Sequence, residues 1–501
     1  MTVPTDLPDL FAAVLTAEPG LPALVQGGRT LTYAAWWDGS GLAGSLLAER
    51  GVVAGDVVAL LLPSGPEFSI WYLAVLRLGA IVSAVNPRLG PVEVAHILAR
   101  SRPRLTVTDA PERIPRGVVV DVRAGTPDGL DPLREARSTV PADPAVIVWT
   151  TGTTGLPKGA WFDHATLRFI GANLGPLSAP YDRKLMPVPF AHSGYVTRLY
   201  EQVAHRSALI LTPAVWSAES MLEVLERERV TVGQGVPTQW EKLLQLKALD
   251  QADLSCLRLV ATGASRVPAA LVTAMRERLG CPVVVRYAST EVPLAFGTRL
   301  ADPAETVERT VGGPLGGAEV EIRSADGRRL ATGEVGRVFL RSRAAMRGYW
   351  GDPEMTAQTL DAEGWLASND LGSQDAAGDL TIIGRADDAY IRGGYNVHPS
   401  EVEAVLAAHP QVGRVAVVGT PAPVIGEVGV AFVVPRDPGA TVSAQDLRAW
   451  CRDRIADYKV PDAVAFLTDL PVNATFKVDV ARLRQLAGQV IADTPRAAGD
   501  R

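Results

Sequence analysis

The sequence predicts an α/β fold: a large N-terminal layered α/β domain with mainly parallel sheets, followed by a small C-terminal α+β domain. Two observations predict the large domain. Strand patterns and helix patterns alternate over residues 1–140, as they do in layered folds with parallel sheets. The chain has 501 residues, of which 47% are hydrophobic, enough for more than one core.

Apolar and β-branched runs predict strands at 57–62, 81–85 and 105–108, with helices at 67–78 and 92–100 between them. Residues 68–85 are the most membrane-like stretch. Arg77 stands in its middle, so a core helix followed by a buried strand is favoured over a membrane span.

The same patterns continue to the end of the chain. They predict strands at 145–148, 230–234, 257–261 and 283–287 and a helix at 218–228. In the small domain they predict strands at 415–418 and 428–434 and a helix at 444–456.

Composition excludes several classes of protein. The net charge of −6 argues against an electrostatic nucleic-acid binder. Cys256, Cys281 and Cys451 form no CxxC pair, which favours a reducing, cytoplasmic setting without a disulfide framework or zinc site. Residues 1–28 contain no Lys or Arg, so no signal peptide is expected.

A loop rich in glycine and threonine follows the strand at 145–148. It reads Thr150-Thr-Gly-Thr-Thr-Gly-Leu-Pro-Lys-Gly159. Glycine lets backbone N–H groups approach a polyanion, and Lys158 adds a positive charge. The loop is therefore either a phosphate cradle or a polar surface turn. It is not a Walker P-loop, because Gly159 follows the lysine where Ser or Thr would bind magnesium.

Two more predicted strands end in small, hydroxyl-rich loops. These are Thr262-Gly263-Ala264-Ser265 and Ala288-Ser289-Thr290-Glu291. Parallel sheets bind ligands beyond the carboxyl ends of their strands. The loops are therefore expected to form the rim of one polar site.

These segments resemble the adenylate-forming (AMP-binding) acyl-CoA synthetase superfamily, which includes luciferases and nonribosomal-peptide adenylation domains. Residues 150–159 resemble its signature loop, and residues 287–291 resemble its second signature, Tyr-Gly-x-Thr-Glu. Further matches follow in the family's order at 333–336, 346–350, 364–372, 384–388 and 393–397. The resemblance spans nearly the whole chain and favours the CoA-ligase-like members.

The resemblance implies a two-step reaction. An acid and ATP give an acyl-adenylate and pyrophosphate, and the acyl group then passes to the thiol of CoA. The residues implied to hold the β- and γ-phosphates are Thr151, Gly152, Thr153, Thr154, Gly155 and Lys158. Thr290 would contact the α-phosphate, and Glu291 with Thr154 would coordinate Mg²⁺, a hard cation that prefers oxygen ligands.

The remaining ligand contacts are also implied by the resemblance. The adenine would lie against Gly263, Ala264, Ser265 and Ala288, with Tyr287 stacked on it. Asp370 and Arg385 would hydrogen-bond the ribose. The pocket for the acid would be bordered by His192, Gly235, Val236, Pro237 and Ala288.

The resemblance divides the chain at a hinge. Residues 1–384 would bind AMP and the acid, residues 385–388 would be the hinge, and residues 389–501 would form a mobile lid domain. The lid would present Lys477 to the acid and the α-phosphate in the first step. In the second it would present Gly393 and Gly394 to the incoming thiol.

Three positions depart from the family pattern. Phe476, Asn369 and Ala288 stand where the family usually has glycine. Phenylalanine does not readily adopt a positive φ, which predicts a differently shaped loop around Lys477.

Three functions stay open at this stage. The first is an acid–CoA ligase. The second is an adenylate-forming enzyme that passes its acid, even one as unusual as nitrite, to an amine or a carrier-protein thiol. The third is a nucleotide-binding protein that has lost catalysis. Arg198, near the pocket segment, would pair either with a second acidic group of the substrate or with a surface carboxylate. The identity of the acid and the oligomeric state do not follow from the sequence.

Overall fold

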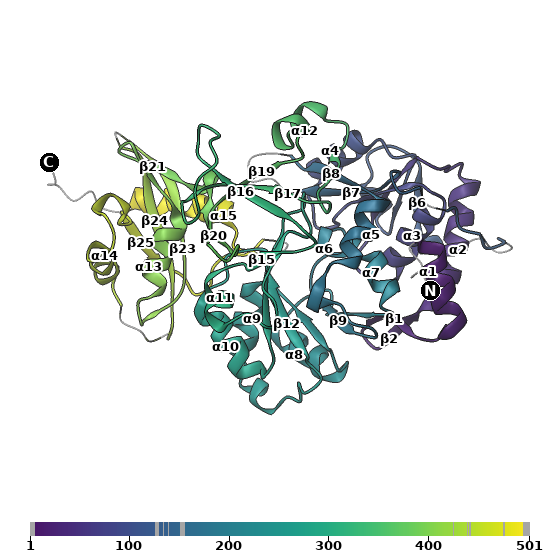
Figure 1. Cartoon of the computed structure of the whole chain (residues 1–501), viewed down its shortest axis with the longest axis horizontal. Helices are drawn as coiled ribbons and strands as arrows, with labels where there is room; N and C mark the ends of the chain where they lie inside the picture. Colours follow the sequence, from purple (N-terminus) through teal and green to yellow (C-terminus); the bar gives the residue numbers. More distant parts are fainter. Residues whose placement is uncertain are drawn as a thin grey trace. The chain divides into compact units, whose positions relative to one another are not determined.

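The computed structural model of the chain (Figure 1) describes residues 6–125, 130–133, 135–138, 140–150, 156–423, 425–437, 439, 442–473 and 476–493. The chain forms two compact units. The N-terminal unit comprises residues 1–320, 340–367 and 377–380, and the C-terminal unit comprises residues 321–339, 368–376 and 381–501. The hinge at 385–388 and the limits 1–384 and 389–501 stay predictions.

The chain passes between the units within one four-stranded sheet. Its strands, in spatial order, are β16 (Glu319–Arg323), β17 (Gly336–Arg341), β19 (Leu366–Gln374) and β20 (Leu380–Arg385).

The first large sheet of the N-terminal unit has seven strands. In spatial order they are β18 (Gly348–Tyr349), β8 (Lys158–Asp163), β7 (Pro144–Thr150), β4 (Ile81–Ala84), β3 (Val57–Leu61), β5 (Leu105–Thr108) and β6 (Val119–Asp121). The strands from β7 to β6 are parallel, whereas β8 and β18 are antiparallel to their neighbours.

The second large sheet has nine strands. In spatial order they are β15 (Gly313–Pro314), β14 (Phe296–Gly297), β13 (Val283–Tyr287), β12 (Leu259–Gly263), β11 (Val232–Gln234), β9 (Arg183–Met186), β10 (Ala208–Leu211), β1 (Pro22–Gln26) and β2 (Arg29–Thr32). The six strands from β13 to β1 are parallel. The predicted layered fold with mainly parallel sheets is confirmed.

Helices of the N-terminal unit connect and cover these strands. They are α1 (Leu7–Ala17), α2 (Tyr33–Glu49), α3 (Pro66–Arg77), α4 (Pro91–Ser101), α5 (His164–Ala172), α6 (Ser193–Val196), α7 (Leu199–Ala204), α8 (Ala218–Arg227), α9 (Pro237–Leu244), α10 (Ala269–Leu279), α11 (Ala304–Arg309) and α12 (Pro353–Thr359). The apolar stretch 68–85 forms α3 and β4, as predicted. No helix in the described part of the chain is both long and apolar enough to cross a membrane.

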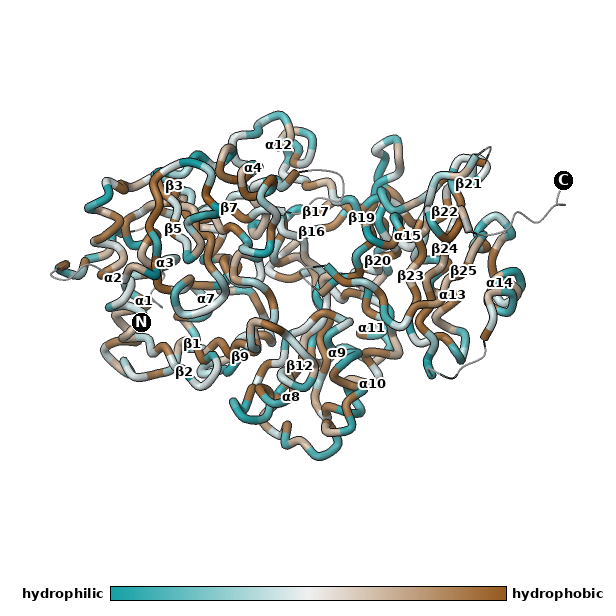
Figure 2. Tube along the Cα trace, turned by 180° about the vertical axis from the view of Figure 1, so that it is seen from behind, coloured by the Kyte–Doolittle hydropathy of each residue, from teal (hydrophilic) through white to brown (hydrophobic). Residues whose placement is uncertain are grey.

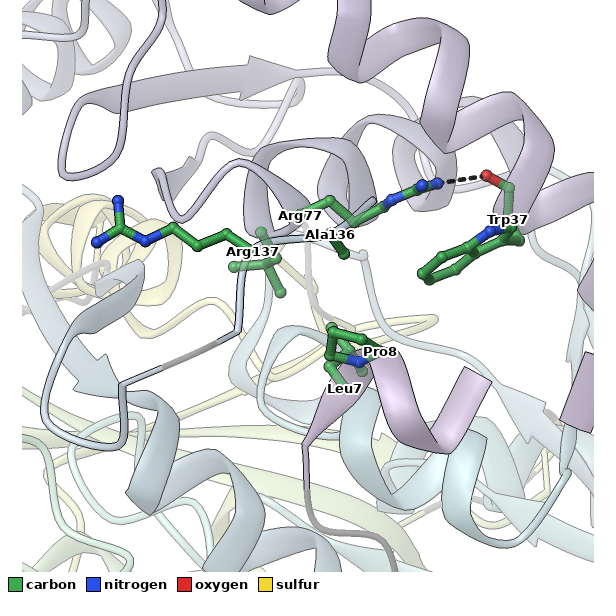
Figure 3. A pocket seen from close by; sticks show the side chains of 7 residues that line it. Leu7, Pro8, Trp37, Arg77, Ala136 and Arg137 are labelled. Atoms are coloured by element: carbon green, nitrogen blue, oxygen red, sulfur yellow. Dashed lines mark hydrogen bonds between the residues drawn. The ribbon is translucent and has the colours of Figure 1, made fainter. Parts of the chain in front are cut away.

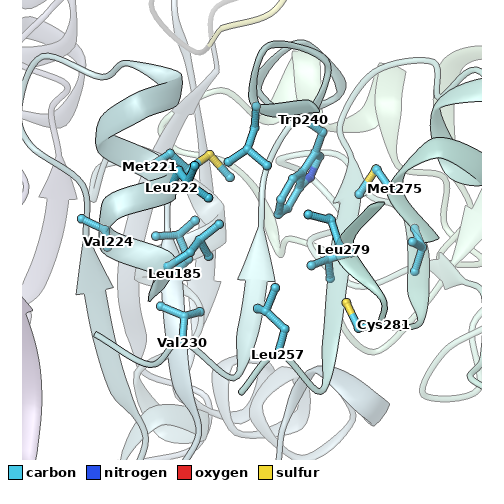
Figure 4. Packing of buried hydrophobic residues seen from close by; sticks show 14 of the residues in the cluster. Leu185, Met221, Leu222, Val224, Val230, Trp240, Leu257, Met275, Leu279 and Cys281 are labelled. Carbon is cyan, nitrogen blue, oxygen red and sulfur yellow. The ribbon is translucent and has the colours of Figure 1, made fainter. Parts of the chain in front are cut away.

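Apolar side chains from strands and helices interlock in the interior. Figure 4 shows Leu185 of β9 and Leu257 meeting Met221 of α8 and Trp240 of α9, all of them buried in one cluster. Several strands of the two large sheets, β3 among them, appear as brown, hydrophobic segments in Figure 2. This burial fixes the sheet whose strand ends carry the candidate site.

Three predicted elements have a wrong boundary where a backbone hydrogen bond intervenes, and the strand predicted at 415–418 extends further in both directions, from Val412 to Ala422. β11 begins at Val232, because the N–H of Val230 still bonds Leu225 at the end of α8. β12 begins at Leu259, because the N–H of Leu257 bonds Leu254 in a turn. The helix predicted at 444–456 ends at Arg452, since the carbonyl of Cys451 accepts from both Arg454 and Ile455.

The C-terminal unit has the predicted α+β composition. Its five-stranded sheet contains β22 (Tyr395–Val397), β21 (Tyr390–Arg392), β24 (Gly426–Pro435), β23 (Val412–Ala422) and β25 (Ala463–Phe466), which pairs with β24. Its helices are α13 (Pro399–Ala407), α14 (Ala444–Arg452) and α15 (Val480–Asp493). Two clusters of buried side chains stabilise the unit.

A pocket near α1 and α3 is lined by the side chain of Arg77 together with Leu7, Pro8, Trp37 and Ala136 (Figure 3). It leaves no room for a water molecule. The guanidinium lies 3.7 Å from the ring centroid of Trp37 and donates to the carbonyls of Trp37 (2.7 Å) and Leu133 (2.5 Å). Arg77 therefore anchors the segment around Leu133 and is not part of a ligand site.

Arg77→Ala is expected to lower the free energy of unfolding by about 3 kcal/mol, because buried carbonyls lose a charged donor. Urea unfolding of the full chain measures this change. Arg309→Ala is the control: Arg309 pairs only at the surface, with Glu305, so the loss should stay within about 0.5 kcal/mol. Equal effects of the two changes would contradict the anchoring role.

Candidate active site

Three adjacent parallel strands of the nine-stranded sheet end at one edge. In the register, Gln234 of β11 pairs with Ala261 of β12, and Gly263 of β12 pairs with Arg286 of β13. The loops that follow β11, β12 and β13 therefore begin side by side. They contain the predicted residues Gly235, Val236, Gly263, Ala264, Ser265, Tyr287, Ala288, Thr290 and Glu291.

The turn after β12 has an unusual backbone. A Cβ at Gly263 would lie 2.2 Å from the carbonyl oxygen of Arg286, so only glycine fits this close approach between the strands. Ala264 has φ +65° and an exposed side chain. Such strain in a non-glycine residue is common at binding sites. The turn exposes Ala264 and Ser265 beside Tyr287, where the adenine contact is predicted.

The predicted acid-pocket residues are held by local contacts. A Cβ at Gly235 would lie 2.8 Å from the indole nitrogen of Trp240, and that N–H donates to the carbonyl of Gly235 at 3.2 Å. Val236 is buried at the start of α9. His192 is half-buried and caps α6, its Nδ1 accepting from the N–H of Gly194 at 3.0 Å.

Lys158 and Glu291 are both neighbours of one tyrosine, Tyr349. Lys158, the first residue of β8, places its Nζ 5.6 Å from the ring centroid of Tyr349 and 3.5 Å from the sulfur of Met355. The Tyr349 hydroxyl donates to Oε1 of Glu291 at 2.9 Å. Burial, reinforced by the Glu291 charge, raises the pKa of Tyr349 well above its usual value, so the phenol stays neutral and keeps donating.

Sequence reasoning did not assign Tyr349 to the site. It matched residues 346–350 only as a pattern, whereas the structure pairs β18 with β8 so that Tyr349 faces Ala160 in the register. The backbone N–H of Met346 also donates to the carbonyl of Glu291 at 2.7 Å. The position of Tyr349 in a matched segment was the available signal.

The loop predicted to hold the β- and γ-phosphates falls largely outside the described residues. Thr151, Gly152, Thr153, Thr154 and Gly155 lie there, and so does the predicted contact of Thr154 with Mg²⁺. On either side of them, Thr150 of β7 pairs with Lys158 of β8. Thr290 and Glu291 lie in a turn closed by the N–H of Ser289 donating to Val292 at 3.1 Å.

In the C-terminal unit, three predicted site residues act on one another electrostatically. Burial lowers the pKa of Lys477, the positive charge of Arg385 lowers it further, and the negative charge of Asp370 opposes both. Arg385 donates from Nε to Asp387 at 2.9 Å. Residues far apart in the sequence are thus brought together within this unit.

The segment around Lys477 is a tight turn. Val472 and Val478 form a bridge, and the N–H of Asn473 donates to the carbonyl of Lys477 at 2.8 Å. Phe476 has φ +60°. The expected change of loop shape was wrong at this residue: Phe476 takes the left-handed conformation that glycine favours.

Phe476→Gly is expected to keep the rate of adenylate formation within about 3-fold of the wild-type rate, because glycine adopts φ +60° without strain. Phe476→Val should lower it at least about 10-fold, because a β-branched residue is a severe outlier at positive φ. Acid-dependent ATP–pyrophosphate exchange measures both changes. A large loss in the glycine variant alone would show that the aromatic ring matters and the backbone conformation does not.

The other two departures from glycine cause no backbone strain. Neither Asn369 nor Ala288 has a positive φ. Asn369 accepts from Arg337 at 3.1 Å, and neighbouring Ser368 is buried, with its hydroxyl accepting from the N–H of Asp370 at 3.1 Å. These contacts hold Asp370 without a glycine beside it.

Gly393 and Gly394 form the two-residue turn between β21 and β22. Their φ angles are +57° and +87°, and Arg392 pairs with Tyr395 across the turn. Positive φ at both central residues is the type I′ pattern that suits hairpins. Both glycines are exposed.

Comparisons with known proteins agree with these features. Residues 11–350 match the AMP-binding enzyme family, and residues 401–477 match the AMP-binding enzyme C-terminal domain. Feruloyl-CoA synthase of Amycolatopsis sp is 32% identical over 481 residues, covering 94% of this chain and 97% of the relative.

Two solved structures illustrate the structural likeness. ATP-bound MatB from Rhodopseudomonas palustris has a TM-score of 0.86 at 27% identity, covering 95% of this chain and 98% of that one. The amide bond synthetase McbA from Marinactinospora thermotolerans has a TM-score of 0.83 at 31% identity, covering 95% and 99%. The chain belongs to the AMP-binding enzyme family.

Proposed function

We propose that this protein activates an organic acid with ATP, releasing pyrophosphate, and transfers the acyl group from the resulting acyl-adenylate to the thiol of CoA. The observation that carries this proposal is the similarity to feruloyl-CoA synthase over 94% of the chain. The exposed strand-end loops and the charges of Lys158 and Glu291 support it.

In the first step an oxygen of the acid attacks the α-phosphorus, and the bond to pyrophosphate breaks. Negative charge accumulates on the α-phosphate and the departing pyrophosphate, so aligned donors and cations supply most of the stabilisation. We assign the pyrophosphate to Lys158 and residues 151–155 and the α-phosphate to Thr290. Lys477 would neutralise the charge that builds between the acid and the α-phosphate.

The nucleoside is assigned to two groups of residues. In the N-terminal unit, the buried Gly263 and the exposed Ala264 and Ser265 that follow it would contact the adenine, with Tyr287 and Ala288. In the C-terminal unit, Asp370 would accept from the ribose hydroxyls and Arg385 would donate to them.

The donor set fits a magnesium ion that enters with ATP. Mg²⁺ is usually bound by one or two carboxylates together with phosphate oxygens. Glu291 supplies one carboxylate, and the hydroxyl of Tyr349 holds its Oε1 at 2.9 Å. The ion would neutralise charge on the phosphates, and Tyr349 would orient the carboxylate that holds it.

In the second step the thiol attacks the acyl carbon, the bond to AMP breaks, and the thioester forms. The hairpin tip of Gly393 and Gly394 has no side chains to block the approach of a thiol. We therefore assign it to the acceptor.

An amine acceptor is the second candidate. The observation that favours it is the 31% identity to an amide bond synthetase over 95% of the chain. In that case the first step is unchanged and a nitrogen attacks the acyl carbon.

Pyrophosphate release with Mg²⁺-ATP over a panel of acids, each with and without CoA, tests the proposal. A CoA thioester identified by mass spectrometry is the expected product. Release that is independent of CoA, with an amide formed when amines are added, would favour the second candidate. Absence of acid-dependent release would contradict both.

A further inference from the structure

A small cavity lies next to the segments that carry the predicted acid pocket. Met186, Tyr195, Arg198, Glu201 and Gln234 are among the residues that line it. Gln234 immediately precedes Gly235 and Val236, and Tyr195 and Arg198 follow His192 within six residues. The lining residues are thus close along the chain to His192, Gly235 and Val236, three of the five predicted pocket residues.

Arg198 has no polar partner for its side chain within the described part of the chain. Its Nε is buried and unbonded, and no ion pair or side-chain hydrogen bond is formed by its guanidinium among those residues. Burial lowers the pKa of Arg198, and the negative charge of Glu201 opposes this effect; a guanidinium stays protonated in proteins. Arg198 is half-buried, and a partly desolvated charge without a bonded partner is costly, so this arginine is suited to a negatively charged ligand.

The neighbouring carboxylates are already engaged. Glu201 is 2% exposed, pairs with the buried Lys184 and accepts from the hydroxyl of Ser178 at 2.8 Å. Asp182 is held by Arg258 at 2.5 Å.

A further cation adds to the positive charge of this region. Burial lowers the pKa of Arg286 on β13, and the positive charge of Arg198 lowers it further, to about 10. Of the residues that line the cavity, Lys184 and Arg198 are cations and Glu201 is the one carboxylate. The region keeps an excess of positive charge.

We propose that Arg198 binds an anionic group at the far end of the acid substrate, so that the preferred substrates are dicarboxylic acids. One carboxylate is activated by ATP, and the other pairs with the guanidinium. This inference rests on the proposed function and names its substrate class. Arg198 is a specificity-determining residue and takes no part in the bond changes.

The size of the cavity agrees with a terminal group rather than a whole substrate. About 10 Å³ is free for the centre of a water-sized group, roughly the space of one water molecule. Met186 borders this space, and methionine is the apolar side chain that adapts its shape most readily. Widening the cavity for the second oxygen of a carboxylate therefore requires little rearrangement.

The test compares matched acids with Arg198 variants. Pyrophosphate release is measured with hexanoate against adipate and with benzoate against terephthalate. The wild type should use the dicarboxylic member of a pair with a higher kcat/KM. Arg198→Met should lower kcat/KM for that member by about 10- to 100-fold, mainly through KM, because a charged hydrogen bond is lost. The same variant should change kcat/KM for the monocarboxylic member by less than about 3-fold.

Two controls separate specificity from folding. Arg198→Lys keeps the positive charge and should retain most of the preference. The melting temperature of the ligand-free Arg198→Met variant should equal or exceed that of the wild type, since a partly desolvated charge without a bonded partner is removed. A lower melting temperature, with both acids of a pair affected equally, would show a structural role and overturn the inference.

The proposed function and this inference fail in different ways. Pyrophosphate release with monocarboxylic acids alone, unchanged in Arg198→Met, overturns the substrate class and leaves the ligase reaction in place. No release with any acid overturns the proposed function and this inference together.

Discussion

Lys477→Ala is expected to slow acyl-adenylate formation by about 10²- to 10³-fold, the effect of removing one donor from a site of developing negative charge. The ammonium group would lie between the acid and the α-phosphate, where charge builds only as the reaction proceeds. Such an interaction is stronger in the transition state than in the ground state, so kcat should fall more than KM rises. Rapid-quench measurement of adenylate formation checks this.

The second half-reaction provides the internal control for Lys477. A preformed acyl-adenylate should react with CoA at a nearly unchanged rate in the Lys477→Ala variant, because that step involves no attack at phosphorus. Lys459→Ala is the matched control variant: Lys459 is in the same unit but is paired with Glu401 at 2.6 Å. Equal loss of both half-reactions in Lys477→Ala would contradict the role given to this lysine.

Glu291→Gln is expected to lower the rate of adenylate formation by about 10²-fold at low magnesium concentration. Glutamine keeps the shape of the side chain and an oxygen that accepts from Tyr349, but it lacks the charge that a hard cation prefers. The loss should be partly restored by raised magnesium. The measurement is the rate of pyrophosphate release against Mg²⁺ concentration at fixed ATP.

Tyr349→Phe is the matched comparison for Glu291. It leaves the carboxylate in place and removes only the hydroxyl that donates to it at 2.9 Å. The rate of adenylate formation is expected to fall less in Tyr349→Phe than in Glu291→Gln, and the magnesium requirement is expected to shift less. A magnesium dependence of Glu291→Gln that matches the wild type would show that this carboxylate does not serve the metal.

The sequence predicted the parts of the fold that depend on local pattern. Buried β-branched runs such as 283–287 give strands wherever they occur, and loops after parallel strands meet at one edge. The glycine-rich turn at Gly263 was predicted as a ligand contact. The physical reason for glycine at this position is that a Cβ added there would lie 2.2 Å from the carbonyl oxygen of Arg286. That distance depends on the register of β12 against β13 and cannot be inferred from one chain segment.

The missed features depend on residues brought together from distant segments. Tyr349 joins the site because β18 pairs with β8. Arg198 was named from the sequence with two possible partners, and only the structure shows that its Nε is buried without a hydrogen bond. Phe476 is a different case. The sequence correctly marked it as a misfit for positive φ, but the bridge between Val472 and Val478 imposes the turn in spite of that preference.

Acid labelled with ¹⁸O in its carboxylate shows whether the acid is activated as an adenylate. When the acyl group leaves for the acceptor, the oxygen that joined the acid to phosphorus stays on the nucleotide. We expect each turnover to give AMP that carries one ¹⁸O atom, detected by mass spectrometry. Unlabelled AMP, or ADP in place of AMP, would contradict it.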